Sequence, residues 1–96
     1  MRAVVIEPGA AWPKIWHFEN AAAVRSAAGA DADYGRYGPY VMISSAHATP
    51  NRVLDGRLLC GTIIITAPGG LGLVEAMELR DDCAAWPQAR WGAANG

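Results

Sequence analysis

The chain has 96 residues, of which 52% are hydrophobic and 18% are charged, and its formal net charge is −1. This length accommodates one domain with one modest core and excludes a separate catalytic lobe. The composition is that of a folded chain rather than a disordered one. The balanced charge argues against direct nucleic-acid binding, which depends on clustered Lys and Arg. We expect residues 1–96 to form a single domain, with 89–96 as a loose tail.

The sequence offers no framework of cross-links or metal ligands. Cys60 and Cys83 are too few and too far apart for a disulfide framework or a zinc site. The paired aspartates lack the further oxygen ligands of a calcium loop. No signal-peptide pattern and no apolar run of about 18 residues is present. The sequence therefore predicts a cytoplasmic protein with no cofactor, no metal and no membrane association.

Two apolar runs near the start predict strands. Arg2–Glu7 (R-A-V-V-I-E) reads as a short strand, which Pro8 and Gly9 end because proline cannot donate to a ladder and glycine permits a turn. Lys14–Phe18 follows as a short edge strand or an extended arm.

A helix and a loop are predicted next. Asn20 suits the N-cap position and Gly29 the C-terminal cap, so Ala21–Ala28 is predicted to be a helix of two to three turns. Its mostly alanine face would bury little area. Ala30–Pro39 is rich in Asp, Gly and Tyr and is predicted to be a turn-forming loop.

The clearest element is Leu58–Ala67, whose run of threonines and isoleucines favours a central strand, either covered on both faces or covered on one face and shielded by a partner on the other. Tyr40–Ser44 is also predicted to be a strand. The segment between them, Ser45–Gly56, is predicted to be a polar connection that contains turn signals.

The end of the chain allows two readings. After a glycine-rich break, Leu71–Leu79 is predicted to return as an antiparallel hairpin strand, and the alternative for Val74–Leu79 is the start of a helix. A short helix through Cys83–Trp86, capped by an aspartate, is expected near the end. The whole pattern predicts an α+β domain with a mainly antiparallel sheet of about four or five strands, one packed helix and a short C-terminal helix.

Catalytic patterns are weak. Ser45 and His47 lie close in sequence, but no G-x-S-x-G elbow surrounds a serine. The glycine-rich segment Pro68–Gly72 lacks the features of a phosphate-binding loop. A small enzyme acting on a nucleotide or a protein, with Ser45, His47 and Arg52 as its polar cluster, is only the third hypothesis for function.

Tyrosines and tryptophans offer contact surface instead. The segment Tyr34–Tyr40 (Y-G-R-Y-G-P-Y) has the composition of interface hot spots, in which aromatic side chains supply area at low entropic cost. The alternative is that one or two tyrosines close the edge of the core. The candidate partner-binding residues are Tyr34, Arg36, Tyr37, Tyr40, Trp86, Arg90 and Trp91.

Four fragments together resemble a known family. They are V-V-I-E-P-G at Val4–Gly9, A-V-R-S-A-A-G at Ala23–Gly29, P-N-R at Pro50–Arg52 and C-G-T-I-I-I at Cys60–Ile65. In this order they resemble a family of small uncharacterised phage and mobile-element proteins, classed as a domain of unknown function. The tyrosine segment and the Trp-rich end depart from the resemblance, which implies no catalytic residues.

Small orphan proteins of phages commonly bind a host machine, and inhibitors of CRISPR or restriction systems are the best-known example. We therefore expect a non-enzymatic protein that binds a host protein or ribonucleoprotein defence complex, of the anti-CRISPR kind. The alternative is a mobile-element accessory protein that binds nucleic acid or modulates transcription. An exposed apolar sheet edge would favour a homodimer.

Overall fold

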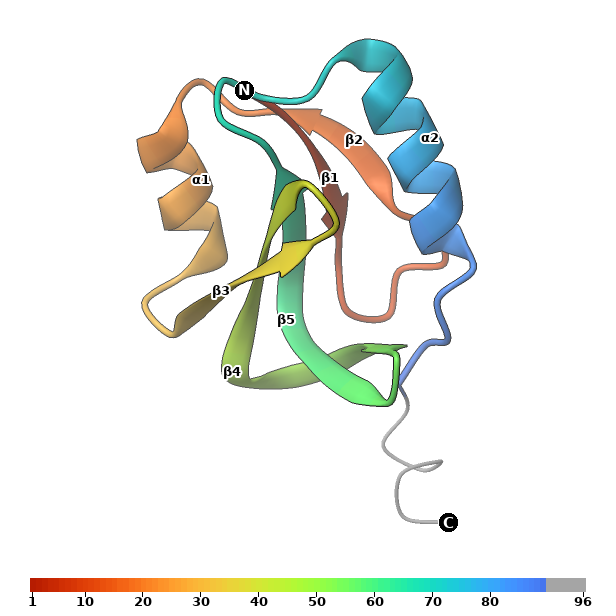
Figure 1. Ribbon diagram of the computed structural model, residues 1–96. Coiled ribbons are helices and arrows are strands. Elements are labelled where there is room, and N and C mark those ends of the chain that lie inside the picture. Colours follow the sequence, from red (N-terminus) through yellow and green to blue (C-terminus); the bar gives the residue numbers. More distant parts are fainter. Residues whose placement is uncertain (90–96) are drawn as a thin grey trace, which may run out of the picture.

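Five strands form one antiparallel sheet with a helix on each face (Figure 1). The computed structural model describes residues 1–89, apart from the side chain of Ala46. The elements in chain order are β1 (Arg2–Ile6), β2 (Lys14–His17), α1 (Ala21–Ala28), β3 (Ala32–Tyr37), β4 (Tyr40–Leu54), β5 (Arg57–Thr66) and α2 (Leu73–Ala84). The strand order is β2-β1-β5-β4-β3, and the predicted α+β class is confirmed.

The isoleucine run lies in β5, the central strand, as predicted. Successive side chains of a strand point to opposite faces. Ile63 and Ile65 therefore join the core under α2, whereas Ile64 joins the core under α1. All three are fully buried, so the strand is covered on both faces.

The helix α1 spans the predicted residues. The Asn20 side chain accepts a hydrogen bond from the backbone N–H of Ala23 (3.0 Å), and Gly29 ends the helix with φ 89°. Val24 is its one buried residue. Because its other inward residues are alanines, α1 covers only part of its sheet face.

Two segments predicted as loops are strands. Ala30–Pro39 contains β3, and most of Ser45–Gly56 belongs to β4. Both segments are polar because β3 is an edge strand and β4 bends away from the sheet with several register shifts against β5 (Figure 1). Hydrogen bonding to a neighbouring strand overrides the weak local preference for strand.

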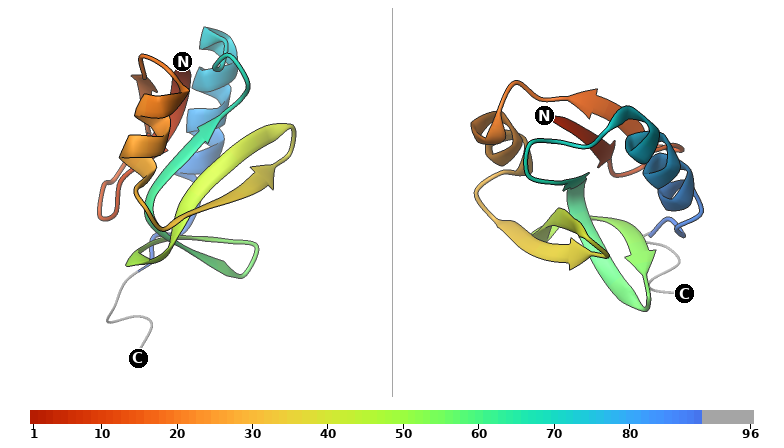
Figure 2. Two further views of the ribbon diagram at one scale, coloured as in Figure 1. Left: turned by 90° about the vertical axis from the view of Figure 1, so that its left-hand side faces the viewer. Right: turned by 45° about the horizontal axis from the view of Figure 1, so that its top comes forward.

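The predicted hairpin strand Leu71–Leu79 is wrong, and its helical alternative is correct. One helix, α2, runs from Leu73 to Ala84 and includes the residues expected to cap a separate short helix. Ala76, Leu79 and Cys83 face the core because they lie three or four residues apart. Figure 2 shows α1 and α2 on opposite sides of the sheet.

Candidate partner-binding surface

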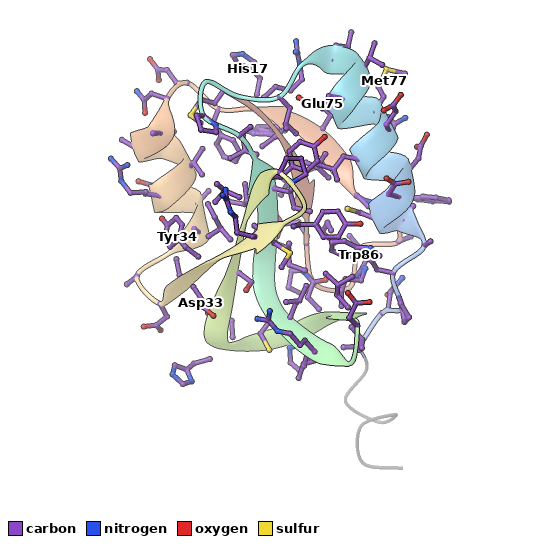
Figure 3. All side chains as sticks on the ribbon, viewed as in Figure 1. His17, Asp33, Tyr34, Glu75, Met77 and Trp86 are labelled. Carbon is purple, nitrogen blue, oxygen red and sulfur yellow. The ribbon has the colours of Figure 1, made fainter. Side chains whose placement is uncertain are left out.

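The predicted tyrosine loop is the β3–β4 hairpin, which has two unlike faces. Tyr37 and Tyr40 pair directly across the turn, and Gly38 adopts the positive φ (58°) that this two-residue turn needs. Because side chains alternate along a strand, Tyr37 points to the α2 side and Tyr34 to the α1 side. Figure 3 shows Tyr34 on the side of α1 and Glu75 and Trp86 on the side of α2.

The α2 side of the hairpin is an anchor. The rings of Tyr37 and Trp86 meet edge to face, with centroids 5.1 Å apart and an angle of 73°. The Tyr40 hydroxyl donates a hydrogen bond to Glu75 Oε2 (3.2 Å). Glu75 Oε1 in turn accepts from the backbone N–H of Gly72 at the start of α2 (3.2 Å). Tyr40 therefore fastens the hairpin to α2, and Tyr37 fastens it to Trp86, two residues beyond the end of this helix.

The same contacts change the acidity of both phenols. Partial burial raises the pKa of Tyr37, and the nearby Cys83 and Asp82 raise it further. Partial burial also raises the pKa of Tyr40, and the Glu75 carboxylate adds to this effect because a negative phenolate beside it is disfavoured. Because an ordinary tyrosine is already protonated at neutral pH, the effect of these contacts is to keep both hydroxyls protonated to a higher pH.

The α1 side of the hairpin presents Tyr34 and Arg36. Both side chains are exposed, and Tyr34 retains 53% of its accessible surface. In the ladder, Tyr34 lies opposite Ile43 and Arg36 lies opposite Val41. The tyrosine and the arginine therefore border an apolar strip of β4 on the same sheet face.

A groove of about 240 Å³ lies between this hairpin and α1. Val24 of α1 and Val41 and Ile43 of β4 contribute apolar walls, and Tyr34 and Arg25 also line it. The groove exists because the eight residues of α1 are too few to cover the sheet as far as β3. Sequence reasoning missed it, although the alanine-rich helix was the available signal.

The strand β3 is an edge of the sheet, and it pairs only with β4 among the described residues. In an antiparallel pair every second residue turns its backbone groups toward the neighbouring strand, so the other residues of β3 turn theirs outward. Such an edge accepts another strand. The homodimer was predicted for an exposed apolar edge, whereas β3 is an exposed but polar edge, so the homodimer stays a prediction.

The other predicted contact residues do not extend this surface. Trp86 is a core residue with 9% exposure, so its ring is covered by the fold rather than presented to a partner. Arg90 and Trp91 lie outside the described residues. Of the predicted contact residues within residues 1–89, Tyr34 and Arg36 are therefore the two exposed ones, and the groove lies beside them.

The P-N-R segment is a buried polar cluster. Asn51 and Arg52 are 1% and 2% exposed. The Asn51 Nδ2 donates to the carbonyl oxygens of Ile6 (2.8 Å) and Gly61 (2.6 Å). Arg52 donates to Asn51 Oδ1 (2.8 Å) and to the Ala10 carbonyl oxygen (2.6 Å). Two side chains thus join β1, the loop after it, β4 and β5.

Arg52 has no carboxylate partner among the described residues, where the one ion pair joins Arg80 and Asp81. Burial lowers the pKa of the Arg52 guanidinium, but an arginine still carries its charge at neutral pH. Carbonyl and amide oxygens therefore stabilise this charge. The guanidinium is thus occupied by bonds within the fold, whereas His47 is exposed, and an enzymatic role for Ser45, His47 and Arg52 stays a prediction.

Within residues 1–89, no group of three or more His, Cys, Asp or Glu side chains is arranged to hold a metal ion. No helix in this part of the chain is long and apolar enough to cross a membrane.

No family model, curated protein or solved structure matches the chain. The resemblance to small phage proteins therefore remains a prediction from four short fragments.

Proposed function

We propose that this protein is a non-enzymatic protein of a phage or mobile element that binds a host defence complex in the bacterial cytoplasm and inhibits it, with a CRISPR complex as the favoured target. The observation that carries the proposal is the exposed pair of Tyr34 and Arg36 on an anchored hairpin. Tyrosine and arginine are enriched among residues that dominate binding energy. The resemblance to phage proteins supports the choice of target.

The anchored hairpin suits a binding role because little conformational entropy would be lost on association. Tyr40 already holds the hairpin against α2, and Tyr37 holds it against Trp86 just after this helix. A partner would then have to order only the exposed side chains, and preorganisation of this kind increases affinity.

The test combines capture with a functional assay. The tagged protein is used to capture partners from lysates of cells with active CRISPR and restriction systems, and mass spectrometry identifies them. The same protein is expressed in those cells before phage infection. We expect recovery of a stoichiometric defence complex and restored plaque formation, and both should be lost in the Tyr34→Ala/Arg36→Ala double variant.

A matched control removes one exposed aromatic residue and one exposed arginine from outside this surface. Trp12, with 72% exposure in the loop after β1, and Arg57, at the start of β5, serve this purpose. The Trp12→Ala/Arg57→Ala variant should keep both activities. Recovery of nucleic acid alone, or equal loss in both double variants, would contradict the proposal.

A further inference from the structure

The groove between α1 and the β3–β4 hairpin has the size of a site for one side chain. Its volume of about 240 Å³ is below the roughly 300–1,000 Å³ typical of pockets for drug-sized ligands. Val24, Val41 and Ile43 are among the residues that line it, and Tyr34 offers an aromatic surface on the β3 side. A large apolar side chain that entered the groove would be removed from water on several sides.

The groove is also electrostatically one-sided. Among residues 1–89, Arg25 is the one charged side chain that lines it, and no acidic residue does so. Arg36 lies beside the groove, opposite Val41 and on the same sheet face. Neither arginine forms an ion pair within residues 1–89. An apolar group that carries a negative charge is therefore the complementary ligand.

We propose that this groove binds an apolar anchor residue, preferably aromatic, that stands next to a carboxylate in an acidic segment of the partner protein. The apolar walls would supply most of the binding energy by excluding water. Arg25 and Arg36 would contact the carboxylate, and the planar guanidinium group is well suited to this role. The identity of the ligand as part of a protein rests on the proposed function, whereas the chemistry of the groove does not.

The chemistry can be tested with two small probes that share one aromatic group. N-acetyl-L-tryptophan carries a carboxylate, and N-acetyl-L-tryptophanamide is neutral. Each is titrated into the full ¹⁵N- and methyl-labelled protein and followed by NMR. We expect both probes to shift the signals of Val24, Val41 and Ile43, with the carboxylate binding about tenfold more tightly, which corresponds to roughly 1.4 kcal/mol.

Variants separate the two parts of the site. Arg25→Gln/Arg36→Gln should abolish the preference for the carboxylate while leaving weak binding of both probes. Ala21, an exposed residue of α1 that lines the groove, can be enlarged without entering the core. Ala21→Phe should block both probes. Equal affinity for the two probes, or signal shifts confined to other surfaces, would overturn the proposed chemistry.

The same variants distinguish failure of the groove from failure of the function. If Ala21→Phe blocks the probes but still captures the host complex in full, the groove is not the partner site, and the proposed function stands. If both probes bind as expected but no host complex is captured by any variant, the proposed function is wrong, and the ligand chemistry of the groove stands.

Discussion

Replacing Asn51 with alanine should cost a large part of the stability of this protein. The side chain is 1% exposed and makes three hydrogen bonds, two as donor to the carbonyls of Ile6 and Gly61 and one as acceptor from Arg52. A neutral hydrogen bond contributes about 1 kcal/mol and one to a charged group about 1.5–3 kcal/mol. The sum predicts a loss of about 3.5–5 kcal/mol, against a total of roughly 5–14 kcal/mol for a domain of this size.

Urea unfolding followed by tryptophan fluorescence, with linear extrapolation to water, measures this loss. Asn20→Ala is a suitable control because it removes one exposed helix cap and should cost only about 1 kcal/mol. Arg52→Met should lower the free energy of unfolding by less in the Asn51→Ala background than in the native protein. The reason is that the two side chains are hydrogen-bonded to each other, and Asn51→Ala has already removed that bond. A loss below 1 kcal/mol for Asn51→Ala would refute the role assigned to this cluster.

Three further predictions concern the fold. Gly61→Ala should destabilise the protein by roughly 2 kcal/mol or more in urea unfolding, because its φ of 69° is unfavourable for alanine and the new Cβ would lie 2.9 Å from a β4 side-chain carbon. An unchanged free energy of unfolding would contradict this close approach of β4 to Gly61. Burial raises the pKa of the Cys83 thiol from 9.0 to about 12, with a contribution from the nearby Asp82. The unfolded chain therefore loses this proton first, and stability should fall from about pH 9 to pH 12 with a slope of up to roughly 1.4 kcal/mol per pH unit. If the stability of the Cys83→Ala variant fell with pH as steeply as that of the native protein, this assignment would be wrong. Tyr37→Ala should cost about 2 kcal/mol and change the near-ultraviolet circular dichroism of Trp86, because it removes an edge-to-face contact; an unchanged spectrum would argue against the anchor.

Local signals predicted the elements that depend on local chemistry. The isoleucines of β5 and the caps of α1 at Asn20 and Gly29 are where the sequence indicates, because β-branching and capping act within a few residues. The strand β3 was missed because its polar residues suit an edge whose pairing with β4 is non-local. The length of α2 was missed because its apolar residues also fit a short strand.

The polar cluster shows a different limit. Asn51 and Arg52 follow a proline and look like a turn, because turns and buried polar clusters use the same residue types. Only the tertiary structure brings the carbonyl groups of Ile6, Ala10 and Gly61 to these side chains. Burial of a charged residue without a carboxylate partner has no signature in the sequence.

The candidate surface was predicted in composition but not in orientation. The sequence indicated the tyrosines and the arginine, and the alternative reading that some tyrosines close the core applies to Tyr37 and Tyr40. Had β3 been recognised, alternation along this strand would have separated Tyr37 from Tyr34 and Arg36, and pairing across the turn would have placed Tyr40 with Tyr37. The groove exists because α1 leaves part of the sheet near β3 uncovered, and this arrangement is seen only in the folded structure.

The most direct test of this account measures stability and capture on the same Tyr34→Ala/Arg36→Ala preparation. Both side chains are exposed, so the free energy of unfolding should stay within about 0.5 kcal/mol of the native value while capture of the host complex is lost. A stable variant that still captures the complex, or an unstable variant, would contradict the claim that these two residues serve binding rather than folding.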